Sequence, residues 1–164
     1  QALVFSTLWA GMPLQSGSAV RNAIVADVVR GLGADPATGN VTPEGLAAAY
    51  RRGLERLPEA LQAAPHLLEH YLLNEMFQNV FPFDAPDAFQ AYLRLVARFG
   101  LLRLMLAARC NTDGPLPDAE ALAQTARVHA RRFNHDPQFM ARVDRALADS
   151  GWASMDKLLR LLPG

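Results

Sequence analysis

The chain has 164 residues, of which 51% are apolar and 20% charged, and this excludes a mainly disordered protein and fits one folded domain. Sixteen Lys and Arg balance sixteen Asp and Glu, so no overall basic field would attract nucleic acid or anionic lipid. The single cysteine, Cys110, excludes an internal disulfide and favours the cytoplasm.

Composition also predicts the fold class. Ala and Leu together number 53, whereas Val, Ile and Thr number 16, and the first two lose the least conformational freedom in a helix. We expect an all-α, single-domain, irregular array of about six to eight helices around one long central helix. The sequence contains no run of about 18 or more apolar residues, so we expect no membrane-spanning helix.

Helix boundaries follow from capping residues and prolines. Ser18 and Thr42 are the expected N-caps of the second and third helices, and Pro58 is expected to end the third. The predicted helices cover part of residues 1–10, Ala19–Leu32, Pro43 to about Leu57, Pro65 to about Val80, Pro86 to about Arg109, Asp118–Phe133, Pro137–Asp149 and Ser154–Leu162. We expect Phe81-Pro82-Phe83 to form a corner that folds the fourth helix back against the long one.

Charged residues on the long helix suggest an ion pair. Arg94, Arg98 and Arg109 fall in one polar sector, whereas Arg103 projects into the apolar stripe. A buried guanidinium needs a carboxylate or a route to water. Glu75, in apolar company on the preceding helix, is the predicted partner of Arg103.

The histidines each allow two interpretations. His66 and His70, with Glu69, match H-x-x-E-H, a zinc-binding pattern, but the motif is short and an exposed face is the favoured interpretation. His129 lies on the apolar side of its helix, which favours a hydrogen-bonded core imidazole over a pocket residue. His135 lies at a break between helices and could orient a loop or face a cleft.

Two further groups of side chains stay open at this stage. The arginines of the last helices form a small basic face that is either solvated or meets an acidic partner. Four aromatic side chains either fill the core, which is favoured for most of them, or line a cavity or partner face. The basic face comprises Arg127, Arg131, Arg132, Arg142 and Arg145, and the aromatic set comprises Tyr71, Phe77, Tyr92 and Phe99.

Three stretches together resemble a known family. Residues 67–83 read LLEHYLLNEMFQNVFPF, residues 92–103 read YLRLVARFGLLR, and residues 132–135 read RFNH. In this order they resemble the C-terminal half of the flagellin lysine-N-methylases, the FliB-like proteins, in which a Y-L-x-N helix runs into F-P-F before a long helix. The resemblance covers about residues 67–162.

The resemblance implies transfer of a methyl group from S-adenosylmethionine to lysine side chains of flagellin. It also implies a cysteine-rich N-terminal part associated with an iron–sulfur cluster, which is absent from these residues. We therefore expect the chain to be a C-terminal portion of a longer enzyme, without predicting activity for the portion alone. Near a target amine, the residues to test first are Glu75, Tyr71, His129 and His135, as supports of the site.

An alternative from another class is a helical ligand-sensing or dimerisation domain of a transcription regulator, with the aromatic set lining its cavity. Exposed helix faces would allow a homodimer. A zinc hydrolase built on His66 and His70 is a third alternative. Clustered cysteines upstream in the reading frame would favour the methylase, and a helix-turn-helix there would favour the regulator.

Overall fold

A computed structural model describes residues 18–35, 38, 40–134 and 138–159, and over these residues the chain is helical with no strand. The all-α prediction is confirmed. The helices are α2 (Ala19–Gly31), α3 (Pro43–Leu61), α4 (Leu67–Gln78), α5 (Ala88–Cys110), α6 (Ala119–Asn134), α7 (Phe139–Asp149) and α8 (Met155–Leu159). The helix predicted within residues 1–10 and the end of the last predicted helix lie outside the described residues.

The structure contains the N-terminal caps predicted for the second and third helices. The side-chain oxygens of Ser18 and Thr42 accept hydrogen bonds from backbone N–H groups in the first turns of α2 and α3. Asp87 does the same for α5, so this helix begins at Ala88, two residues after the predicted start.

The predicted end of α3 is wrong, because the helix continues through Pro58 to Leu61. A proline inside a helix costs about 3 kcal/mol through its missing N–H and its clash with the preceding turn. Leu57 and Ala60, on either side of Pro58, are both buried in the cluster that packs on α5. Burial of the last turn offsets the local penalty, which a sequence rule cannot weigh.

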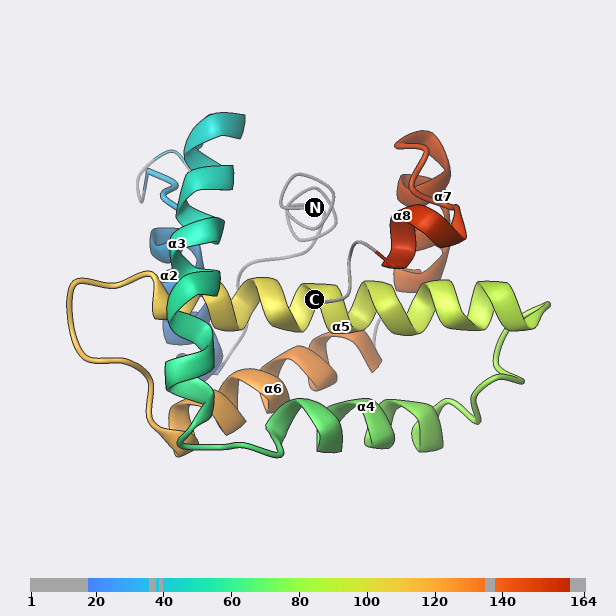
Figure 1. The fold of residues 1–164 in the computed structure, drawn as a ribbon, viewed down its shortest axis with the longest axis horizontal. Coiled ribbons are helices and arrows are strands. Elements are labelled where there is room, and N and C mark those ends of the chain that lie inside the picture. The colour runs from blue at the N-terminus through green and yellow to red at the C-terminus, as the bar shows by residue number, and fades with distance from the viewer. Residues whose placement is uncertain (1–17, 36–37, 39, 135–137, 160–164) are drawn as a thin grey trace.

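Figure 1 shows that α5 crosses the middle of the molecule, with α2 and α3 over its C-terminal half and α4 and α6 running along one side. α7 lies against its N-terminal half. The helix is therefore buried almost all round, and Leu101, Leu102, Leu104 and Met105 are fully inaccessible. The polar sector predicted on this helix is wrong at Arg98, which is buried.

Two glycines allow the closest helix contacts. A Cβ atom at Gly31 of α2 would lie 1.8 Å from the carbonyl oxygen of Ala108, and one at Gly53 of α3 would lie 2.0 Å from that of Ala107. Both distances are far shorter than any real contact. α2 and α3 therefore rest directly on the backbone of α5 near its C-terminal end.

The corner after α4 is formed as predicted, and α4 runs back antiparallel along α5. The N–H of Phe81 donates to the carbonyl oxygen of Met76 at 2.9 Å, which closes the end of the helix. Val80 supplies the left-handed residue of this cap with φ 53°, a conformation that glycine usually adopts. No described helix combines the length and apolar character that a membrane crossing requires.

Candidate functional site

Three of the four predicted site residues meet in one buried cluster between α4, α5 and α6. The hydroxyl group of Tyr71 on α4 lies 3.2 Å from Nδ1 of His129 on α6, in a buried hydrogen bond. The two rings meet edge to face with centroids 5.4 Å apart. His129 is fully buried, so the core interpretation of this residue is confirmed. His135 lies outside the described residues.

Glu75 lies one helical turn beyond Tyr71, on the same face of α4, and is 1% exposed. Its Oε2 atom accepts a hydrogen bond from Nη1 of Arg98 at 2.8 Å and from Nδ2 of Asn79 at 3.1 Å. The carboxylate and the guanidinium form a buried ion pair. We call the set Tyr71, Glu75, Asn79, Arg98 and His129 the interhelix network.

The predicted partner of Glu75 is therefore wrong, since Glu75 pairs with Arg98 and not with Arg103. α4 and α5 run antiparallel, so the short corner between them fixes which turns lie opposite. Arg103 lies more than a turn further along α5. Burial raises the pKa of the Tyr50 phenol on α3, and the positive charge of Arg103 partly opposes the rise.

The environment of Tyr71 keeps its hydroxyl group protonated. Burial raises its pKa well above the usual value of 10.0, and the negative charge of Glu75 raises it further, while the positive charge of Arg98 opposes the change. The phenol is therefore a hydrogen-bonding group and not a base at neutral pH. Together with its contact to His129, it fastens α4 to α6.

The raised pKa of Tyr71 predicts a loss of stability in alkaline solution. In the unfolded chain the phenol ionises at about pH 10, whereas in the fold it stays protonated beyond that pH. The contribution is fully present below the unfolded pKa and is lost as pH rises toward the folded one. Denaturant unfolding at about pH 9 and about pH 11 measures the loss.

Tyr71→Phe should reduce this alkaline loss, because the variant has no phenol to ionise at that position. Part of the loss should remain, since the pKa of Tyr50 is also raised. Equal losses in the variant and the unchanged protein would show that Tyr71 does not titrate abnormally.

A small cavity lies between the interhelix network and the corner. Its volume is about 10 Å³, close to the space that one water molecule needs. Glu75 Oε1, Arg98 Nε, Asp84 Oδ1 and Arg94 Nε are buried here without a hydrogen-bond partner among the described residues. The cavity is far too small for a lysine side chain, so in this conformation the network holds helices together and admits no substrate.

The H-x-x-E-H segment lies at the exposed start of α4. His66 Nδ1 is 3.5 Å from a carboxylate oxygen of Glu69, and the ring of His66 stacks on that of His70 with centroids 5.6 Å apart. In the described part of the chain, no group of three His, Cys, Asp or Glu side chains is placed to hold a metal ion. The segment has the exposed character that the sequence favoured.

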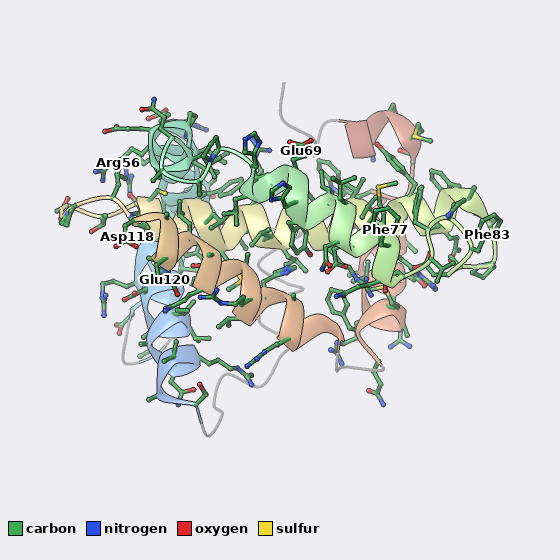
Figure 2. The ribbon with its side chains drawn as sticks, turned by 90° about the horizontal axis from the view of Figure 1, so that it is seen from below. Arg56, Glu69, Phe77, Phe83, Asp118 and Glu120 are labelled. Atoms are coloured by element: carbon green, nitrogen blue, oxygen red, sulfur yellow. The ribbon has the colours of Figure 1, made fainter. Side chains whose placement is uncertain are left out.

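The residues of the aromatic set differ in their burial, and one residue of the basic face forms an ion pair. Tyr71 and Phe99 are buried in the core, Tyr92 is partly buried, and Phe77 is 81% exposed, so the core interpretation is wrong for Phe77. Figure 2 shows Phe77 and Phe83 near one end of the molecule. In the basic face, Arg127 pairs with Glu120 of its own helix.

The comparison with known proteins places the chain among the C-terminal domains of lysine N-methylases. It belongs to the family described as the FliB lysine N-methylase C-terminal domain, whose model matches residues 5–161. The predicted resemblance is confirmed, and it extends well before residue 67. No curated protein and no solved structure matches the chain.

Proposed function

We propose that the chain is the C-terminal helical part of a cytoplasmic lysine N-methylase that transfers methyl groups from S-adenosylmethionine to lysine side chains of flagellin. The observation that carries the proposal is the family match over residues 5–161. The all-helical architecture agrees with the helical segments through which the chain resembles this family.

The reaction requires a neutral lysine amine. Its nitrogen lone pair attacks the methyl carbon of the donor, the carbon–sulfur bond breaks toward sulfur, and the amine releases one proton. A proton acceptor and a site that excludes water assist this step. The interhelix network is closed to substrate, and the cavity of about 10 Å³ beside it cannot hold the donor.

We therefore assign Tyr71, Glu75 and His129 the role of positioning residues. The Tyr71–His129 hydrogen bond joins α4 to α6, and the Glu75–Arg98 ion pair joins α4 to α5. Together they fix three helices relative to one another, which is the support that a site on their surface needs. His135, which follows α6 in the sequence and lies outside the described residues, is kept as a residue to test.

The proposal is tested with the full-length protein that contains this chain, purified flagellin and S-adenosylmethionine. Mass spectrometry of flagellin peptides should show methyl groups on lysine that depend on both protein and donor. An unmodified flagellin, under conditions in which donor and protein are intact, would overturn the proposal.

A positioning role is tested by comparing Tyr71→Phe with His70→Asn in the same assay. His70 is exposed on the same helix, so its replacement should leave the methylation rate unchanged. Tyr71→Phe should lower the rate, and it should also change the amide NMR signals of α6 around His129, because the hydrogen bond between the helices is lost. Unchanged rates and signals would reject the role.

A further inference from the structure

A second, much larger pocket lies at the other end of α5, away from the exposed Phe77 and Phe83. It has a volume of about 590 Å³ and is formed by the C-terminal ends of α2 and α5, the middle of α3, and residues 111–117. In Figure 2, Arg56 and Asp118 mark this end of the molecule, opposite the end at which Phe83 lies. We infer that this pocket, the arginine pocket, binds a small molecule through a carboxylate or phosphate group.

The lining of the arginine pocket carries an excess of positive charge. Arg30, Arg52 and Arg109 line it, against the two carboxylates of Asp27 and Asp113. Over the whole chain the charges balance at sixteen of each sign, so the excess is local to this pocket. The planar guanidinium group matches carboxylate and phosphate oxygens with paired hydrogen bonds.

The ion pairs inside the pocket leave donors unused. Asp27 serves two arginines, with Oδ1 at 3.0 Å from Nη1 of Arg30 and Oδ2 at 3.5 Å from Nη2 of Arg109. Arg52 donates only through Nε, to Oδ1 of Asn111 at 3.3 Å, and its terminal nitrogens make no hydrogen bond within the described chain. Each guanidinium has five N–H donors, so Arg30 and Arg52 keep most of theirs.

Carbonyl groups near the ends of the two helices beside the pocket already accept hydrogen bonds. Helix C-termini expose carbonyl groups that repel an anion, and α2 and α5 both end here. Nδ2 of Asn111 donates to the carbonyl oxygen of Gly31 at 2.7 Å, and its backbone N–H donates to that of Ala107 at 3.0 Å. Asn111 thus occupies a carbonyl group near the end of each helix, and its side-chain oxygen accepts the hydrogen bond from Arg52.

The remaining contacts make the pocket rigid on one side and open on the other. Arg109 is anchored deeply, because Nη1 donates to the carbonyl oxygen of Ala121 at 2.8 Å and to the hydroxyl group of Thr125 at 2.6 Å. Arg30 and Arg52 are exposed at the rim. A volume of about 590 Å³ lies within the range of small-molecule sites, roughly 300–1,000 Å³.

The test uses full-length protein labelled with ¹⁵N on glycine, because Gly31, Gly33 and Gly114 line the pocket and report on it directly. The probes are inorganic phosphate and citrate, each compared with sodium chloride at equal ionic strength. Saturable shifts of the three glycine signals with phosphate or with citrate support the inference, and the stronger probe identifies the oxyanion. No saturable shift with either probe overturns it.

Variants then locate the binding. In Arg30→Gln/Arg52→Gln, both changes lie at the exposed rim, and binding of the better probe should weaken by about tenfold or more through loss of charge-assisted hydrogen bonds. Arg51→Gln is the matched control, since Arg51 is an exposed neighbour on α3 that does not line the pocket. Equal weakening in the control, or full binding in the double variant, would reject the site.

The inference does not depend on the methylase assignment. A protein that methylates flagellin but gives no saturable shift in the arginine pocket would retain its proposed function and lose this site. Saturable binding without methylation of flagellin would support the arginine pocket and overturn the proposed function.

Discussion

Arg98→Met is expected to lower the free energy of unfolding by about 3–5 kcal/mol, because the variant leaves a buried carboxylate without its counter-charge. Glu75 is 1% exposed, and after the change its Oε2 atom keeps the hydrogen bond from Asn79 but has lost the ion pair. Methionine fills much of the volume of arginine, so loss of packing contributes little. Urea unfolding at neutral pH, with the slope checked against the unchanged protein, measures the effect.

The control for this variant is Arg127→Met, which removes an exposed ion pair. Arg127 and Glu120 are 57% and 66% exposed, and a pair of this kind contributes about 0–1 kcal/mol. Arg98→Met combined with Glu75→Leu should recover most of the lost stability, since it removes both charges. A single Arg98→Met variant that behaves like the control would show that the pair is not buried in solution.

Local sequence signals were sufficient for most of the fold. Ser18 and Thr42 are predictable caps because a capping side chain acts over three residues, and the structure contains both hydrogen bonds. The end of α3 predicted at Pro58 is wrong, because burial against α5 lets the helix continue past the proline. The gain from that burial depends on a neighbour about fifty residues away in sequence, which no local rule includes.

In the candidate site, too, local signals predict some features, whereas contacts between separate helices are not predictable from the sequence. The apolar neighbours of Glu75 and of His129 on their helices are local signals, and they predict the buried positions of both residues. The choice of Arg103 failed because a helical projection gives the face of a residue but not the turn of the opposite helix that it meets. The arginine pocket gave no sequence signal, because Arg30, Arg52 and Arg109 come from three separate helices.

Gly53→Ala is expected to destabilise the protein by about 3 kcal/mol, although helix propensity alone predicts a gain of about 1 kcal/mol. An added Cβ would lie 2.0 Å from the carbonyl oxygen of Ala107 and 2.6 Å from its carbon, and backbone atoms of a central helix cannot rotate away. α3 would have to move off α5 and loosen the buried contacts of Tyr50 and Leu57 on either side. Urea unfolding measures the loss.

Gly45→Ala is the control that separates the close contact of Gly53 with α5 from the general effect of replacing a glycine in α3. Gly45 lies in the first turn of the same helix, and the nearest atoms to its added Cβ belong to the side chains of Thr42 and Val41, at 3.0 and 3.8 Å. These side chains can shift, so the change in stability should stay within about 1 kcal/mol. Similar results for both variants would mean that α3 does not rest on the backbone of α5, and the helix packing derived from Gly53 and Gly31 would be incorrect.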